Sequence, residues 1–163
     1  MIEISVMQPE QWQLYKAVRC AALADAPYAF SGTLENARQQ SDAEWAAITY
    51  QRATKPKNVV FFAFEGDIAC GMSACGVDDT NEAEMFAVWV ASTHRRKGVG
   101  IALIDFADQW AKAQGAKLLK VGVFADNVGA VQFYLANGFQ DIGRTKPELS
   151  NAERTVLLLI KQA

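Results

Sequence analysis

Apolar and polar positions along the chain follow two different periods. Alternating or continuous apolar runs predict strands at 2–7, 58–64, 68–76, 83–91, 117–125, 139–145 and 153–161. Apolar residues spaced three and four apart predict helices at 10–24, 41–52, 99–114 and 127–137. The segment 25–33 breaks both patterns and is interpreted as a loop.

Local signals set several element boundaries. Ser41 followed three residues later by Glu44 predicts a capping box at a helix start. Glu65-Gly66-Asp67 lies between two apolar runs and predicts a hairpin turn. Gly115 and Gly138 are placed to close the two last helices.

The order of elements predicts the fold class. It reads β-α-α-β-β-β-α-β-α-β-β, beginning with antiparallel connections and finishing with crossovers. We therefore expect an α/β (α+β) fold in one domain over 1–163, with a mixed central sheet of about six to seven strands and helices on both faces. The run at 83–91 is almost continuously apolar, which favours a central strand.

Composition limits the classes of function. The chain has 163 residues and a net charge of −2, so no general nucleic-acid surface is expected. Three cysteines without framework spacing and a single histidine, His94, favour neither a disulfide scaffold nor a metal site. The N-terminus has no leader pattern and no apolar run is long enough to span a bilayer, so we expect a cytoplasmic protein without membrane contact.

A basic, glycine-containing stretch, HRRKGVG at 94–100, joins a predicted strand to a predicted helix. Free amides at a helix start bind anions, and glycines let the backbone approach phosphate oxygens closely. A P-loop is excluded because no hydroxyl residue follows Lys97-Gly98, and the dinucleotide fingerprint fails at Leu103. The stretch by itself fits either a diphosphate cradle or a solvated basic turn.

Two motifs that follow each other along the chain favour the diphosphate cradle over the solvated turn. The first motif is R-x-x-G-x-G at 95–100, and the second is N-x-x-A-x-x-x-Y-x-x-x-G-F at 127–139. Together with the hairpin FEGDIACG, these motifs resemble those of the GNAT superfamily of N-acetyltransferases. The resemblance extends in element order over almost the whole chain. His94, Arg96 and Ser92 depart from the family pattern, which often has an aromatic residue, a glycine and a proline at these places. None of these departures removes a backbone donor.

The resemblance implies acetyl-CoA as acetyl donor, with no metal. The residues that it implies for acetyl-CoA binding are Val88, Trp89, Val90, Arg95, Arg96, Lys97, Gly98, Val99, Gly100, Asn127 and Tyr134. On the strand the main chain would pair with the pantetheine arm, while the valine side chains belong to the core. Asn127 also suits a simple helix cap.

Proton transfer needs an acid and a base. By resemblance Tyr134 protonates the leaving thiolate, and a phenol with an ordinary pKa of ~10 stays protonated at neutral pH. The alternative is a tyrosine that packs beside Phe133. For the base, Glu84 is a weak candidate among the neighbouring carboxylates Asp78, Asp79 and Glu82. The alternative is that these carboxylates are simply solvated in a turn and that a chain of water molecules accepts the proton.

Two other side chains receive structural interpretations. His94 is expected on the surface of its loop. Cys75 is expected to fill space in a strand, because no nearby cation would lower the pKa of its thiol.

The acceptor is expected to be a primary amine of a small molecule or peptide. Tyr28 and Phe30 either form a wall of its site or pack the first helix onto the sheet, and the loop 145–153 forms the other wall. The apolar closing strand 154–162 predicts a homodimer that covers this edge or the neighbouring sheet face. A non-catalytic CoA-binding sensor or interaction module on the same fold is the rival to direct acetyl transfer.

Overall fold

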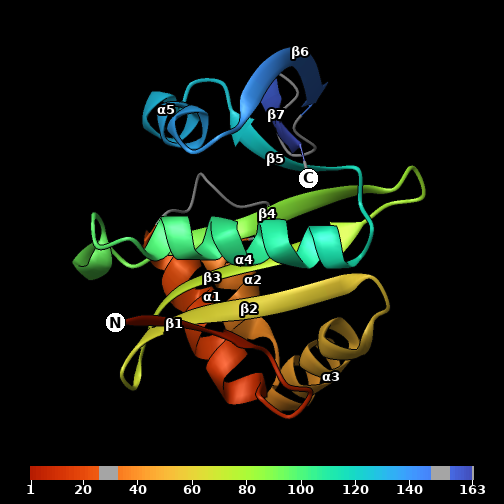
Figure 1. Cartoon of the computed structure of the whole chain (residues 1–163). Coiled ribbons are helices and arrows are strands. Elements are labelled where there is room, and N and C mark those ends of the chain that lie inside the picture. The colour runs from red at the N-terminus through yellow and green to blue at the C-terminus, as the bar shows by residue number, and fades with distance from the viewer. Residues whose placement is uncertain (26–32, 148–154, 163) are drawn as a thin grey trace. The chain divides into compact units, whose positions relative to one another are not determined.

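The computed structural model describes residues 1–25, 33–147 and 155–162. Figure 1 shows its strands, which are β1 (Ile2–Val6), β2 (Asn58–Glu65), β3 (Ile68–Val77), β4 (Glu82–Val90), β5 (Leu118–Phe124), β6 (Gln140–Pro147) and β7 (Thr155–Gln162). The helices are α1 (Trp12–Asp25), α2 (Leu34–Gln39), α3 (Asp42–Thr54), α4 (Val99–Ala113) and α5 (Val128–Ala136), with a short 3-10 turn at Ser92–His94.

The described strands form one sheet in the order β1-β2-β3-β4-β5-β7-β6. β1 pairs antiparallel with β2, β4 pairs parallel with β5, and β7 pairs antiparallel with both β5 and β6. The predicted mixed sheet and the α+β class are therefore confirmed. By its contacts the chain divides into two compact units, Met1–Ala74 with Ala87–Phe106 and Cys75–Phe86 with Ala107–Ala163. A single domain over 1–163 stays a prediction.

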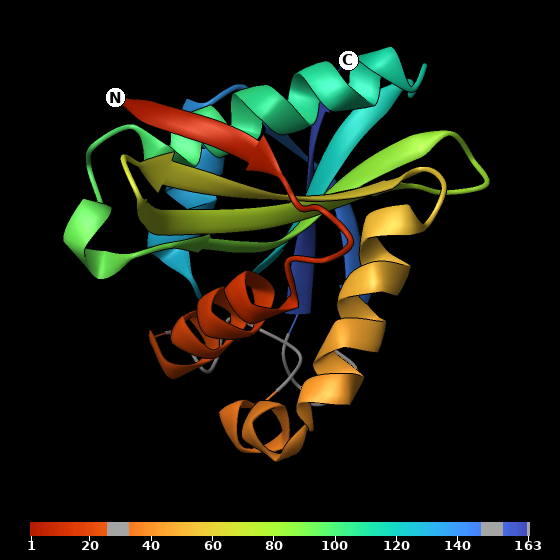
Figure 2. The same ribbon diagram turned by 90° about the horizontal axis from the view of Figure 1, so that it is seen from below.

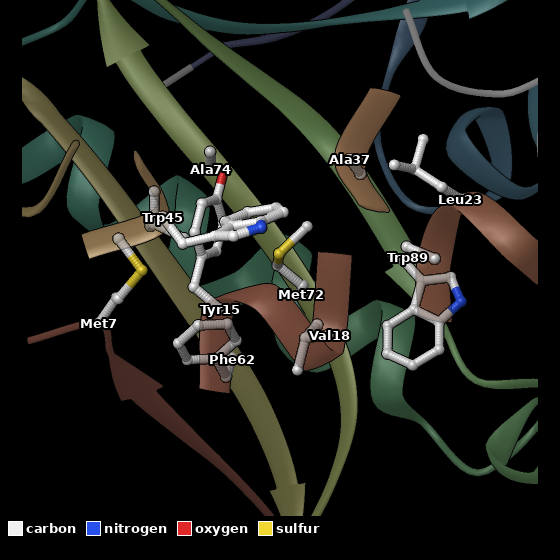
Figure 3. Packing of buried hydrophobic residues seen from close by; sticks show 12 residues of the cluster. Met7, Tyr15, Val18, Leu23, Ala37, Trp45, Phe62, Met72, Ala74 and Trp89 are labelled. Atoms are coloured by element: carbon white, nitrogen blue, oxygen red, sulfur yellow. The ribbon is translucent and has the colours of Figure 1, made fainter. Parts of the chain in front are cut away.

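In the first unit, helices cover both faces of the strands (Figure 2). Val60 and Phe62 of β2 belong to a buried cluster with residues of α1, α2 and α3. Figure 3 shows this cluster, in which the rings of Tyr15 and Trp45 meet edge to face with centroids 5.7 Å apart. The intervening Phe61 contacts Phe106 of α4 instead, at a centroid distance of 4.5 Å, because neighbouring strand residues point to opposite faces.

In the second unit, β7 lies between β5 and β6. The prediction that the closing strand lies at an edge of the sheet is wrong. Val156, Leu158, Leu159 and Ile160 are buried. A strand with neighbours on both sides is expected to carry apolar residues on both faces, which explains the pattern.

The predicted boundary signals hold. Ser41 and Glu44 make both hydrogen bonds of the capping box, at 3.1 and 3.2 Å. Gly66, Gly115 and Gly138 all have positive φ values at the turns that they were predicted to form. The helix α2 was not predicted; the Thr33 hydroxyl caps it by accepting from the amide of Asn36 at 3.2 Å. Among the described residues, no helix has the length and apolar character to cross a bilayer.

Candidate functional site

The loop at 95–98 joins the 3-10 turn to α4. Arg95, Arg96, Lys97 and Gly98 are exposed, and α4 begins with the amide of Ala102 donating to the carbonyl of Gly98 at 3.0 Å. Gly98 has a φ of +85°, and no atom lies within 4 Å of the place where a Cβ would be. The helix start is therefore accessible beside three exposed cationic side chains, as an anion site requires.

Packing beneath the loop fixes the first turn of α4. Val99 is buried, whereas its neighbour Gly98 is exposed. A Cβ on Gly71 of β3 would lie 2.8 Å from Cγ1 of Val99 and 3.1 Å from the carbonyl oxygen of Trp89. Only a glycine at position 71 lets the helix start pack this closely on β3 and β4.

His94 is buried, which corrects the prediction of a surface position. Its Nε2 lies 3.3 Å from Oε1 of Glu65, and its Nδ1 lies 2.8 Å from the hydroxyl of Thr93. The β2–β3 hairpin thus supplies the partner that allows a polar ring to be buried next to the loop.

β4 supplies the other predicted part of the donor site. Trp89 is buried, and Val88 and Val90 are partly buried. The ladder from β4 to β5 covers Glu82–Met85, and Ala87 has a φ of +53°. A non-glycine residue with this backbone is uncommon and marks an irregular place in the strand. The first unit brings together Val88–Val90 and Arg95–Gly100.

Asn127 and Tyr134 belong to the second unit. The Asn127 side chain caps α5 by accepting from the amide of Ala130 at 3.2 Å, as predicted. The carbonyl of Tyr134 accepts from the amides of Asn137 and Phe139. With Gly138 at a φ of +95°, the bond from the Phe139 amide is the six-to-one bond of a Schellman motif, which ends the helix.

The same motif fixes the tyrosine ring. Tyr134 packs edge to face against Phe133 and Phe139, each with ring centroids 5.4 Å away. Burial raises the pKa of Tyr134 to about 12. The phenol therefore stays protonated over the whole physiological pH range, as a proton donor must.

The carboxylates near the start of β4 are engaged with cations. Lys120 Nζ lies 2.9 Å from Asp78 and 3.0 Å from Glu82, and Arg144 also binds Glu82. The Thr80 hydroxyl, followed by Lys120, lowers the pKa of Asp78. Arg144, followed by Lys120, lowers the pKa of Glu82. Carboxylates stabilised in this way are weak bases, so these two are poor candidates for proton abstraction. Glu84 is partly buried in the same strand.

Two cysteines are fully buried. Burial raises the pKa of the Cys75 thiol, and Glu84 adds to the effect. Burial likewise raises the pKa of Cys70, whose thiol points to the carbonyl of Ala63 at 3.5 Å. Cys75 behaves as the predicted strand filler, since a neutral thiol is a poor nucleophile. In the described parts of the chain, no three His, Cys, Asp or Glu side chains group as a metal site.

Two predicted acceptor residues, Tyr28 and Phe30, lie outside the described residues, as do positions 148–153 of the second loop. Sequence reasoning missed Gly71 and Asp25, the latter an ion-pair partner of Arg95. Gly71 carries a local signal, because a glycine inside an apolar strand indicates close backbone approach. For Asp25 the sequence offers no such signal.

Comparison with known proteins identifies the family. The family model of the Acetyltransferase (GNAT) family matches residues 21–139, which contain both motifs and the hairpin. The chain belongs to the GNAT family of acetyltransferases. This GNAT chain is 29% identical over 105 residues to an uncharacterized N-acetyltransferase of Methanocaldococcus jannaschii, a match that covers 60% of the chain and 46% of the relative. The chain spans less than half the length of the curated relatives it matches.

Solved structures share the fold of this GNAT chain. A GNAT acetyltransferase from Streptococcus pneumoniae has a TM-score of 0.75 at 18% identity, with 99% of both chains covered. The PaiA N-acetyltransferase of Thermoplasma acidophilum, solved with coenzyme A, has a TM-score of 0.73 at 17% identity, covering 100% of this chain and 99% of the other. At these identities the likeness concerns the fold.

Proposed function

We propose that the protein is an acetyl-CoA-dependent N-acetyltransferase that transfers the acetyl group directly to a primary amine. The observation that carries this proposal is the helix start at 95–100, where Arg96 and Lys97 precede Gly98, an exposed glycine in the left-handed conformation. Free amides and two cations at one helix end match a diphosphate.

The chain's own residues fit the donor. The main-chain amides from Gly98 onward would hold the diphosphate, because a Cβ at Gly98 would fill the open space that a phosphate oxygen needs. Val88, Trp89 and Val90 would offer their main chain to the pantetheine arm, and Asn127 would add a hydrogen bond beyond its capping role. Acetyl-CoA, when bound, supplies the activated thioester.

The transfer itself needs few groups. The neutral amine attacks the thioester carbonyl carbon, forming the C–N bond, and a main-chain amide of Val88–Val90 stabilises the oxyanion. The C–S bond then breaks, and Tyr134 gives its proton to the leaving sulfur. The amine loses its extra proton to a water chain, with Glu84 as the weaker protein candidate. The lowered pKa values of Asp78 and Glu82 make those carboxylates unsuitable.

The acceptor is proposed to be the amine of a small molecule or peptide. Tyr28 and Phe30 would form one wall of its site. The net charge of −2 favours a cationic acceptor. We also propose a cytoplasmic location, which agrees with three free cysteines at positions 20, 70 and 75.

A binding module without catalysis is the rival proposal, and thiol release separates the two. Acetyl-CoA is incubated with a panel of polyamines, aminoglycosides, amino acids and peptides, and free CoA is measured against time. Amine-dependent release supports the enzyme. CoA binding by calorimetry without release for any amine would favour the module.

Tyr134→Phe tests the acid. The change removes one hydroxyl and keeps the ring contacts to Phe133 and Phe139, so folding and CoA affinity should barely change. We expect kcat to fall by ~10²–10⁴ for any accepted amine. Tyr50→Phe is the matched control, because Tyr50 is exposed. Since burial raises the pKa of Tyr134 to about 12, loss of the acid by ionisation should leave the rate unaffected up to about pH 10. An unchanged kcat in Tyr134→Phe would make the residue a packing residue only.

A homodimer is also proposed, now through the second unit. β6 is the last strand of the sheet order, and Ile142 on it is exposed. Val128 and Leu135 of α5 are exposed apolar residues as well. Light scattering at micromolar concentration should give twice the chain mass of 17.9 kDa, and Ile142→Arg should return it to the monomer mass. A monomer in the unchanged protein contradicts the proposal.

A further inference from the structure

One carboxylate oxygen joins three distant parts of the first unit. Oδ2 of Asp25, the last residue of α1, accepts from Nε1 of Trp89 at 3.2 Å and from Nη2 of Arg95 at 3.1 Å. The two donors come from β4 and from the first position of the basic loop. A single acceptor atom therefore fixes an indole and a guanidinium against the end of one helix.

The two contacts differ in their physical consequences. Trp89 is only 7% exposed, so its indole N–H would be costly to leave without an acceptor. The Arg95 side chain is 58% exposed and that of Asp25 29%, so this ion pair is partly solvated. Burial of the indole thus determines where the carboxylate sits, and the carboxylate then holds the guanidinium.

Both partners of Asp25 belong to the donor site of the proposed function, on which this inference rests. We propose that Asp25 is a positioning residue for that site. It holds Trp89 between the two valines whose main chain would receive the pantetheine arm. It also anchors the loop at Arg95, directly before the residues whose amides would receive the diphosphate. A group that orients such residues acts through them, without touching the substrate itself.

The pairing of Arg95 with Asp25 also indicates that the three cations of the loop have different roles. The guanidinium of Arg95 is paired with Asp25 at 3.1 Å, so its main contribution is to hold the loop. Arg96 and Lys97 follow it and are exposed. These two cations are assigned the electrostatic attraction of the phosphates.

Limited trypsin digestion without any ligand tests the anchoring. Asp25→Asn keeps an oxygen acceptor for Trp89 and removes the charge that holds Arg95. We expect cleavage after Arg96 and Lys97, identified by mass spectrometry, to become about three- to ten-fold faster. Asp42→Asn is the matched control, because it breaks the Lys16–Asp42 ion pair of 3.2 Å elsewhere in the same unit. Equal loop cleavage in wild type, Asp25→Asn and Asp42→Asn would overturn the proposal.

Coenzyme A affinity, measured by calorimetry, tests the role in the donor site. Asp25→Asn and Arg95→Gln should each weaken binding about three- to ten-fold, and the double variant should be no weaker than either one. For any accepted amine, Asp25→Asn should raise KM for acetyl-CoA and leave kcat unchanged. If the two single effects multiply in the double variant, Arg95 contacts the phosphates independently and the proposal is overturned.

The two experiments separate this inference from the proposed function. A wild-type protein that binds no coenzyme A would overturn the function, and the digestion result would still decide whether Asp25 anchors the loop. Normal coenzyme A binding with unchanged digestion and affinity in Asp25→Asn would overturn the positioning role alone.

Discussion

Arg96 combines a charged side chain with an unusual backbone. Its φ is +63°, in the left-handed region, and its side chain is exposed. Many GNAT sequences have a glycine here, as noted above, and glycine adopts this conformation without a Cβ clash. Arginine at this position adds a cation to the loop at the expense of backbone strain, so conformation and charge oppose each other in one residue.

Two substitutions at Arg96 separate these effects. Arg96→Gly relieves the strain, and we expect a gain of about 0.5–1 kcal/mol in the free energy of unfolding. Arg96→Gln keeps the strain and should show no gain. Both variants lose the cation, so both should bind coenzyme A about two- to five-fold more weakly. Urea unfolding and calorimetry measure the two quantities. Equal stability of the two variants would contradict strain at this position.

At the scale of elements, the packing of the start of α4 on β3 leaves no room for a side chain at Gly71. Gly71→Ala would place a Cβ 2.8 Å from Val99 Cγ1, so either the helix start or the strand must move. We expect a loss of about 1–3 kcal/mol in the free energy of unfolding, with weaker coenzyme A binding. Gly129→Ala is the control, because nothing lies within 4 Å of its Cβ position and alanine favours the helix.

Val99→Ala in the Gly71→Ala chain provides the second control. It removes the atom that the new methyl group would meet, so the two losses should be less than additive in urea unfolding. Strict additivity would show that the Gly71 effect arises somewhere other than this contact.

The sequence was sufficient for elements whose boundaries are encoded locally. The capping box at Ser41 and Glu44, the turn at Gly66 and the helix end at Gly138 depend on neighbours within a few residues. The six-residue helix α2 was missed because fewer than two helical turns show too little periodicity. β7 was misplaced as an edge because strand order depends on pairing between distant segments.

The same reason applies to the candidate site. Gly98 and Asn127 have conformations that depend on their neighbours in sequence, and the pattern placed both at the starts of their helices, where the structure has them. Burial of His94 depends on Glu65, and the position of Arg95 depends on Asp25. Contacts between residues this far apart in the chain produce no periodic pattern in the sequence, so they can be identified only in the folded structure.

For the whole molecule, the cluster of Asp78, Glu82, Lys120 and Arg144 links stability to pH. The pKa values of both carboxylates are lowered, chiefly by Thr80 for Asp78 and by Arg144 for Glu82. Below their ordinary values of 3.8 and 4.5 the unfolded chain binds more protons than the folded one, so stability falls as pH drops further. Burial acts to lower the pKa of Lys120, but its bonds to Asp78 and Glu82 raise it overall. The contribution of Lys120 to stability is therefore fully present below pH 10.5, and it is lost as pH rises through the raised pKa of Lys120 in the folded protein.

Glu82→Gln should therefore destabilise the protein at pH 7, and the difference from wild type should shrink as pH falls from 5 to 3. Urea unfolding at pH 7, 5, 4 and 3 measures this. Asp79→Asn, at an exposed neighbouring carboxylate, should show little difference at any of these pH values. A gap between wild type and Glu82→Gln that stays constant with pH would contradict the linkage.

Because Cys70 and Cys75 are buried, the number of reactive thiols can be used to follow unfolding of the protein. Both thiols are shielded and have raised pKa values, whereas Cys20 is only partly buried. A maleimide or disulfide reagent applied to the native protein therefore meets one candidate thiol, and global unfolding brings the number to three. Stoichiometry of modification thus counts unfolded molecules directly. In a colorimetric assay of released coenzyme A, the same shielding keeps the protein's own contribution to the colour small.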